Sequence, residues 1–318
     1  MDCNEKTCCE TTCPESSEYI LTTDNLTKIY GKHKAANAIN LHIKKGEVYG
    51  LIGRNGAGKT TILKMICGLS NPTSGSFTFC GKTGAEVKPL MKKIGSLIES
   101  PGLYPKLTAY QNVMLKCISM GLGSKEYVLS LLDQVGLSAA AKKQAGSFSL
   151  GMKQRLGIAI ALVGDPDFVV LDEPINGLDP QGIAEMREII HSLSRDKGMT
   201  VIVSSHILDE LAKVADSFGI INAGQLIDEF SSEQLVYRCG KHCVVRSNDN
   251  DKTMALLNEM GITALSINEQ GLVRIDGDVE DSSVIIEKLV KSGVKVYEFA
   301  TKQGTLEEYY LTRTGRTV

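Results

Sequence analysis

The spacing of apolar residues changes along this chain, and each change predicts a different arrangement of strands and helices. Through 19–53 apolar and polar residues alternate, as they do in half-buried strands, with glycine and lysine turns between the runs. After a glycine loop, the run ILKMICGL at 62–69 predicts a helix. From 106 to 163 apolar residues recur three and four positions apart, which predicts helices over 107–122, 125–137 and 151–164.

Two short apolar runs rich in β-branched residues follow, at 167–174 and 199–207. Such runs are typical of strands that are buried on both faces of a parallel sheet. Each leads into a sequence with helical spacing, 183–196 after the first run and 208–215 after the second. This alternation predicts an α/β domain with a helical insertion, formed by residues 18–234.

Beyond about Leu235 the pattern predicts a second, smaller domain over 235–318. Its segments follow the β-α-β-β-α-β order of a ferredoxin-like unit, with a hairpin around Glu269, Gln270 and Gly271. A last short helix is expected after Thr305, with Thr305 as its N-cap and Glu308 completing a capping box. The six segments of the ferredoxin-like unit are 241–247, 252–262, 264–268, 272–276, 283–293 and 295–300.

Composition agrees with one large and one small globular domain. At 318 residues the chain exceeds the usual size of a single domain, and its 42% hydrophobic and 23% charged residues are typical of globular proteins. The formal net charge is -2 and the basic residues are scattered, so we expect no nucleic-acid partner.

Residues 1–17 are expected to form a flexible, cysteine-rich tail. They are polar and acidic without the apolar core of a signal peptide, and no later segment supplies the roughly 20 consecutive apolar residues of a membrane span. We therefore expect a cytoplasmic protein whose cysteines are free thiols. A metal bound by Cys3, Cys8, Cys9 and Cys13 stays open beside a metal-free tail, although the spacing lacks the paired C-x-x-C of common zinc sites.

The glycine loop GRNGAGKT, 53–60, matches the phosphate-binding pattern G-x-x-x-x-G-K-T between a predicted strand and a predicted helix. Its glycines let backbone N–H groups turn toward phosphates, Lys59 adds a positive charge, and the Thr60 hydroxyl can bind Mg²⁺. ATP and Mg²⁺ are the expected cofactors. The predicted nucleotide-binding residues of this segment are Gly53, Arg54, Asn55, Gly56, Ala57, Gly58, Lys59, Thr60 and Thr61.

Two carboxylates end the apolar run FVVLDEP, at the sheet edge where open α/β proteins bind ligands. Asp172 is expected to hold Mg²⁺ through water together with Thr60, and Glu173 to take a proton from the attacking water or to orient it. His206 follows the run VIVSS and is expected at the same edge, where it could bond the γ-phosphate or simply start a helix. We favour the phosphate role and name Glu173 and His206 as catalytic candidates.

Five motifs in order, GRNGAGKT, FSLGMKQR, VVLDEP, GLDP and SSH, resemble the Walker A, signature, Walker B, D-loop and H-loop of the ATP-binding subunits of ABC transporters. The resemblance implies a P-loop ABC ATPase domain with a RecA-like core, an antiparallel β part and a helical subdomain. It also implies that Asp179 of the D-loop belongs to the nucleotide site. Tyr30 falls where the family stacks a ring on adenine, although it could equally be a packed strand residue.

The signature departs from the family pattern L-S-G-G-Q-x-Q-R. Ser149 and Gly151 are retained, whereas Leu150 replaces the first glycine and Met152 replaces the glutamine. The resemblance implies that this helix start faces the γ-phosphate held by a second copy, so that a homodimer sandwiches ATP. An ordinary capped helix start is the alternative.

A second departure points to a subgroup of the family. Glu99 stands at the Q-loop glutamine position, and as an acid it can accept a hydrogen bond from metal-bound water but cannot donate one as an amide can. We therefore count Glu99 among both the catalytic and the metal-binding candidates. Glu99, the FSLGMKQRLGIA form of the signature and the C-terminal LEEYYLTRTG occur together in this chain. In this combination the chain resembles the bacitracin-resistance and lantibiotic-immunity group of ATP-binding subunits.

This resemblance implies the ATP-hydrolysing motor subunit of an exporter that protects against peptide antibiotics, held at the inner face of the membrane by separately encoded permease subunits. The family's permease-contacting surface corresponds here to Glu99, Pro101, Leu103 and Tyr104, which could equally be packed loop. One alternative is export of another substrate, such as a lipid, polysaccharide or drug. A soluble ATP-dependent switch is the other, less favoured because the chain has one motif set, no coiled coil and no basic stripe.

Overall fold

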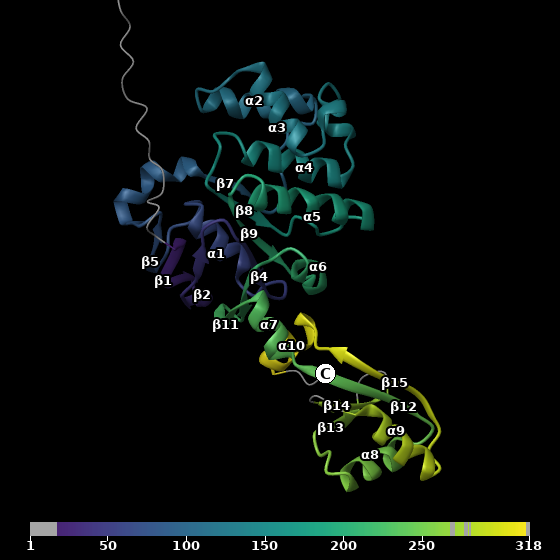
Figure 1. Ribbon diagram of the computed structural model, residues 1–318. Helices are drawn as coiled ribbons and strands as arrows, with labels where there is room; N and C mark the ends of the chain where they lie inside the picture. The colour runs from purple at the N-terminus through teal and green to yellow at the C-terminus, as the bar shows by residue number, and fades with distance from the viewer. Residues whose placement is uncertain (1–17, 268–270, 277–278, 280, 316–318) are drawn as a thin grey trace, which may run out of the picture. The chain divides into compact units, whose positions relative to one another are not determined.

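The computed structural model describes residues 18–267, 271–276, 279 and 281–315. It divides into two compact units, one ending at Glu229 and the other beginning at Phe230 (Figure 1). The predicted domain boundary at 234/235 lies within helix α7 (Ser232–Cys239) and stays a prediction. The predicted tail over 1–17, with its four cysteines, lies outside the described residues.

A six-stranded sheet with the order β11-β10-β4-β9-β8-β7 forms the centre of the first unit. The neighbouring pairs from β10 to β7 are parallel. Every residue of β4, β8 and β9 is buried, which explains why their sequences are continuous apolar runs rather than alternating ones. The strands are β4 (Val48–Ile52), β7 (Ile94–Leu97), β8 (Phe168–Asp172), β9 (Thr200–Ser205), β10 (Ser217–Asn222) and β11 (Gln225–Ser231).

A second sheet carries the alternating N-terminal strands. Strand β1 pairs antiparallel with β2, β3 and β5, and β5 pairs antiparallel with β6. Strands β5 and β6 were not predicted from the sequence, because the run at 74–79 is short and its only apolar side chains, Phe77 and Phe79, stand at its end. The bounds are β1 (Tyr19–Tyr30), β2 (His33–Ile39), β3 (His42–Lys44), β5 (Ser74–Phe79) and β6 (Lys82–Thr83).

The predicted helical insertion is confirmed. Helices α2 (Ala109–Ser119), α3 (Lys125–Gln134) and α4 (Leu150–Ala161) contact one another and lie together in Figure 1. Thr108 and Gln111 form a capping box at the start of α2. The other helical segments of this unit are α1 (Lys59–Ile66), α5 (Pro180–Arg195), α6 (Leu208–Ala212) and the 3₁₀ segments at Gly84–Lys93, Ser138–Ala140 and Ala145–Ser147.

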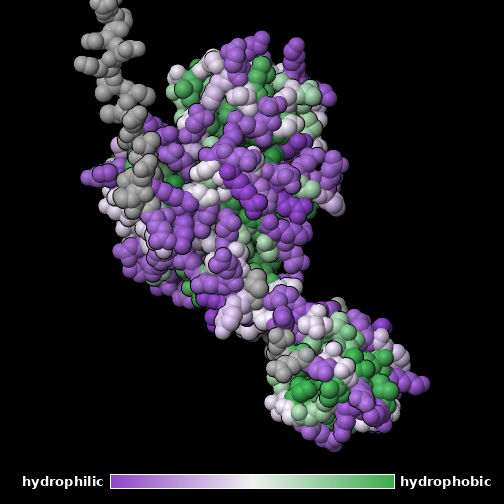
Figure 2. All heavy atoms as spheres, viewed as in Figure 1, coloured by the Kyte–Doolittle hydropathy of each residue, from purple (hydrophilic) through white to green (hydrophobic). Residues whose placement is uncertain are grey.

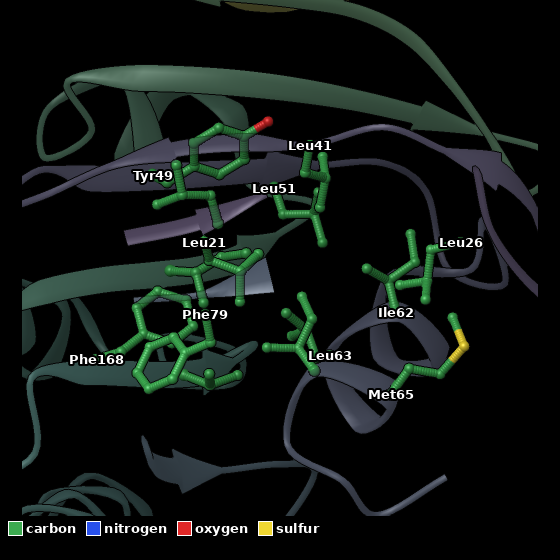
Figure 3. Close-up of a cluster of buried hydrophobic side chains, with 14 of the residues drawn as sticks. Leu21, Leu26, Leu41, Tyr49, Leu51, Ile62, Leu63, Met65, Phe79 and Phe168 are labelled. Atoms are coloured by element: carbon green, nitrogen blue, oxygen red, sulfur yellow. The ribbon is translucent and has the colours of Figure 1, made fainter. Parts of the chain in front are cut away.

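Side chains from both sheets and from α1 share one hydrophobic core, shown in Figure 3. Phe79 of β5 and Phe168 of β8 are both fully buried, and their ring centroids lie 6.1 Å apart. Ile62, Leu63 and Met65 pack into the same core from α1. The glycine loop and its helix are therefore fixed to the parallel sheet by apolar packing. Hydrophilic side chains cover most of the visible surface of this unit (Figure 2).

The second unit has the predicted β-α-β-β-α-β order. Its antiparallel sheet has the strand order β13-β14-β12-β15, the arrangement of a ferredoxin-like fold. The capping box before α10 is confirmed, since Glu308 N–H donates to Thr305 Oγ1 at 3.2 Å. The predicted hairpin turn includes residues 269 and 270, which lie outside the described residues. The elements are β12 (Lys241–Ser247), α8 (Asn250–Glu259), β13 (Leu265–Ile267), β14 (Val273–Asp276), α9 (Ser282–Lys291), β15 (Val296–Gln303) and α10 (Leu306–Arg313).

One expectation about the cysteines is wrong. Cys67, Cys117, Cys239 and Cys243 are free thiols, but Cys80 is disulfide-bonded. The expectation rested on the redox state of the cytoplasm, whereas bond formation also requires two sulfur atoms at bonding distance, which only the fold decides.

Candidate functional site

The glycine loop after β4 forms a tight cradle that requires glycine at residue 58. Gly56 and Gly58 have φ angles of 80° and 110°, in the left-handed region that favours glycine. A Cβ atom on Gly58 would lie 2.3 Å from the carbonyl oxygen of Ala35. Gly58 is also the N-cap of α1, so the loop ends at a helix N-terminus, where backbone N–H groups remain available to an anion.

Lys59, Glu173 and His206 form one connected cluster. The Lys59 ammonium, 5% exposed, donates to the carbonyl oxygens of Gly53 at 2.5 Å and Arg54 at 3.3 Å. It also lies 3.0 Å from Glu173 Oε1, and His206 Nδ1 lies 2.7 Å from Glu173 Oε2. The carboxylate therefore lies between a buried cation and an imidazole, at the carboxyl end of the parallel strands.

Backbone geometry directs Glu173 into this position. Its φ of 52° is unusual for a residue with a side chain. The Glu173 N–H is held by Ser204, through the carbonyl oxygen at 3.1 Å and the hydroxyl at 3.0 Å. Such strain persists only where the surroundings hold the residue in place, and it is concentrated at functional sites.

Thr60 and Asp172 are also in contact. The Thr60 hydroxyl donates to Asp172 Oδ2 at 2.7 Å, and the Ser204 hydroxyl donates to Asp172 Oδ1 at 2.5 Å. Asp172 is 2% exposed, so both of its oxygens are oriented by hydroxyl groups in a dry environment. The sequence pattern predicts no role for Ser204, and its one signal is a small hydroxyl side chain at the end of a buried strand.

A hollow of about 360 Å³ opens above the loop. Tyr30 reaches it from the end of β1 and is 50% exposed, with the Lys28 ammonium 5.1 Å from its ring centroid. Tyr30 is therefore not a packed strand residue, and its stacking on adenine stays a prediction. His33 of β2 was not predicted as a site residue. The lining comprises Tyr30, His33, Ala35, Arg54, Asn55, Gly56, Gly58, Lys59, Thr60, Thr61 and Glu173.

A second hollow, of about 440 Å³, contains the predicted residues Ser149, Gly151 and Asp179. Ser149 is the N-cap of α4, and its hydroxyl accepts from Met152 N–H at 3.3 Å. Asp179 is the N-cap of α5, and its carboxylate accepts from Gly182 N–H at 3.1 Å. Ser149, Gly151 and Asp179 therefore lie together, in a lining that does not include the loop residues 53–61.

Glu99 lines neither hollow and pairs with Lys64. Its φ is 63°, its side chain is 63% exposed, and its Oε1 lies 2.5 Å from the Lys64 ammonium on α1. The hydrogen bond to Glu99 raises the pKa of Lys64 above its ordinary value. The predicted catalytic and metal-binding roles of Glu99 stay predictions, since its hydrogen bond here joins it to α1.

The donor set at Thr60 and Asp172 fits Mg²⁺, which proteins bind through one or two carboxylates together with substrate phosphates and water. Among the described residues there is no group of three or more His, Cys, Asp or Glu side chains that could hold a metal by itself. Across the part of the chain that the structure describes, no helix has both the length and the apolar character needed to cross a membrane.

Comparison with known proteins gives a consistent result. Residues 36–176 match the family model described as ABC transporter. The chain is 38% identical over 298 residues to the bacitracin transport ATP-binding protein BcrA of Bacillus licheniformis, covering 93% of this chain and 97% of that protein. It is 49% identical over 210 residues to the lantibiotic transport ATP-binding protein SrtF of Streptococcus pyogenes, covering 66% of this chain and 90% of that protein.

Solved structures agree with these relatives. The cbiO1 protein of Clostridium perfringens, part of the ABC transporter complex cbiONQ, aligns with a TM-score of 0.63 at 29% identity, over 69% of this chain and 91% of that one. A dimeric ATP-binding cassette in a post-hydrolysis state, bound to ADP and Pi, aligns with a TM-score of 0.61 at 28% identity, over 67% of this chain and 98% of that one. With the match to BcrA across both units, these findings show that the chain belongs to the ABC transporter family, as an ATP-binding subunit that hydrolyses ATP.

Proposed function

We propose that this chain is the motor subunit of an exporter that protects a cell from peptide antibiotics of the bacitracin or lantibiotic type. The observation that carries the proposal is the match to BcrA, which extends over 93% of this chain and so includes the C-terminal unit as well as the ATPase unit. Many ABC ATPases share the first unit, so a relative that matches the whole chain is a stronger guide to cargo than the ATPase motifs alone.

In the proposed mechanism, ATP enters the hollow between Tyr30 and the loop 53–60. Lys59 then exchanges its contact with Glu173 for the phosphate oxygens, because a phosphate carries more negative charge than a carboxylate. Glu173 Oε1 becomes free to accept a hydrogen bond from the attacking water, while His206 holds Oε2 at 2.7 Å. When bound by Thr60 and Asp172, Mg²⁺ would supply charge neutralisation at the β and γ phosphates.

The second hollow is the basis for proposing a homodimer. Ser149, Gly151 and Asp179 line a hollow separate from the one that holds Lys59, so one chain offers two half-sites. A second copy would bring its helix start at Ser149 to the phosphates, where the dipole of α4 favours negative charge. ATP would then stabilise the dimer by linkage, and hydrolysis would weaken it.

Transport also requires a membrane partner, which we propose to be a separately encoded permease that holds the chain at the cytoplasmic face of the membrane. The candidate contact surface includes Tyr104, whose side chain is 62% exposed while its backbone N–H and carbonyl oxygen are both bonded to buried Asn112. An exposed aromatic ring on a fixed backbone is suited to a protein contact.

Replacing Tyr104 by Asp is expected to reduce co-purification with the permease by about tenfold, because a charge would replace an aromatic contact. ATPase activity of the isolated chain should stay unchanged. Affinity pull-down from membranes that contain both proteins measures the first effect, and a phosphate-release assay measures the second. The matched control is Tyr297→Asp in β15, because Tyr297 is 58% exposed and belongs to the other unit. Undiminished co-purification and transport in the Tyr104 variant would remove this surface from the proposal.

Cargo is tested by antibiotic susceptibility in a sensitive Gram-positive host that carries the chain with its cognate permease. Wild type should raise the inhibitory concentration of bacitracin or of a lantibiotic, and Glu173→Gln should not. Equal susceptibility with and without the wild-type pair, when both proteins are assembled at the membrane, would contradict the peptide-antibiotic proposal.

A second cargo class has support from another relative. The linearmycin resistance ATP-binding protein LnrL of Bacillus subtilis is 33% identical over 315 residues, covering 94% of this chain and 99% of that protein. Export of a different antibiotic therefore remains the second candidate, and including linearmycin in the susceptibility panel would distinguish the two.

A further inference from the structure

Two leucine–glycine contacts join the start of α4 to the turn that precedes α5. A Cβ atom placed on Gly177 would lie 3.2 Å from Leu150 Cδ2, and one placed on Gly151 would lie 3.7 Å from Leu178 Cδ2. The contacts are reciprocal: each segment supplies one leucine and one glycine. They lie in the hollow that also contains Ser149 and Asp179.

These contacts connect two residues of the proposed site. Leu150 directly follows Ser149, the N-cap of α4, and Leu178 directly precedes Asp179, the N-cap of α5. Gly177 has a φ of 75°, so a residue with a side chain would be strained there as well as crowded by Leu150. Leu150 is nevertheless 47% exposed, so it is not a buried core residue.

Leu150 stands where the family pattern has glycine, and the structure gives this departure a role. We propose that Leu150 is a positioning residue for ATP hydrolysis: by packing over Gly177, it fixes the turn that carries Asp179 relative to the hydroxyl of Ser149. This inference rests on the proposed function, because it assumes that both residues act at the nucleotide. Lys59 and the loop 53–60 hold ATP in the chain's own hollow without this contact. Loss of Leu150 should therefore leave ATP binding to a single chain unchanged and lower turnover, which requires the second copy.

The kinetic test uses Leu150→Ala, Leu150→Met and Gly177→Ala, with Leu129→Ala on α3 as the matched control, since Leu129 is 37% exposed and lies outside both hollows. Leu150→Ala should lower kcat about fivefold at unchanged KM for ATP, because only turnover depends on the contact. Leu150→Met should retain most of the activity, since its long side chain can still cover Gly177. The control should match wild type.

A double-mutant cycle isolates the contact itself. Gly177→Ala alone should also lower kcat, because its methyl group meets Leu150 and its φ is strained. In Leu150→Ala/Gly177→Ala that methyl group has room, so the combined loss should be smaller than the product of the two single losses. The proposal would be overturned if the kcat losses of the two single variants multiplied in the double variant. It would also be overturned if Leu150→Ala had the kcat of wild type, or a raised KM at normal kcat.

A measurement without ATP separates this inference from the proposed function. In hydrogen exchange of the nucleotide-free chain, Leu150→Ala should speed exchange in a peptide covering 177–182. This peptide includes the Gly182 N–H, which donates a hydrogen bond to the Asp179 carboxylate. Peptides from α2 and α3 should not change. Unchanged exchange at 177–182 would overturn the positioning role even if the enzyme is active, whereas a wild-type chain unable to hydrolyse ATP would count against the proposed function instead.

Discussion

Replacing Glu173 by Gln is expected to reduce ATP hydrolysis by at least about 100-fold and to convert the chain to a dimer when ATP and Mg²⁺ are present. Glutamine keeps the shape of the side chain but is no longer a base, so bound ATP would not be consumed. Because the proposed sandwich holds ATP between two copies, unhydrolysed nucleotide should accumulate in the dimer. Phosphate release measures the first effect, and size-exclusion chromatography with ATP and Mg²⁺ measures the second.

The matched control for this variant is Glu126→Gln, an exposed residue in the first turn of α3 that should behave as wild type. The two parts of the prediction can fail separately. Undiminished hydrolysis would exclude Glu173 as the base or orienting group. Strictly monomeric elution of Glu173→Gln at high protein concentration and saturating ATP would exclude the sandwich while leaving the base assignment intact.

Replacing Lys59 by Ala is expected to weaken ATP binding by about 100-fold, the size expected for the loss of two charge-assisted hydrogen bonds to phosphate. Lys59 is 5% exposed and its ammonium already lies among the acceptor oxygens of Gly53 and Arg54, so its charge is held where phosphates would bind. Isothermal titration calorimetry with ATP and Mg²⁺ measures the affinity. Lys125→Ala, on the exposed start of α3, is the control.

Folding has to be checked in parallel, because the substitution leaves the partly buried Glu173 without its cation. A thermal melt monitored by circular dichroism separates loss of binding from loss of structure. If Lys59→Ala melts as a folded protein and binds ATP as tightly as wild type, the loop 53–60 does not hold the phosphates as proposed.

Several elements could be predicted because the information is local. The capping box at Thr305 and Glu308 depends on two side chains three residues apart, and the structure has it. The buried strand β8 is a continuous apolar run because both faces of a parallel sheet are covered, and this also places Asp172 and Glu173 at the strand end. The ferredoxin-like order of the second unit followed from alternating periodicities in the same way.

Other elements left no such signal. Strands β5 and β6 are short and carry only two apolar side chains, Phe77 and Phe79, so their pairing with β1 and with each other was visible only in the fold. Ser204 and Asp172 are 32 residues apart in the chain, and their 2.5 Å hydrogen bond depends on β8 and β9 being neighbours. Glu99 could be recognised as a departure from a motif, but its partner Lys64 could not.

By itself the sequence pointed to the residues that we propose carry the chemistry: the glycine loop with Lys59 and Thr60, the carboxylates Asp172 and Glu173, and the small residues Ser149 and Gly151 at a helix start. Such residues are recognisable because phosphate binding requires fixed residue types at fixed local spacing. Tertiary structure alone decided which of them meet, joining Glu173 to Lys59 and His206 and setting Leu150 over Gly177. These contacts join segments that are distant in sequence, so they depend on sheet order and core packing, which local patterns do not encode.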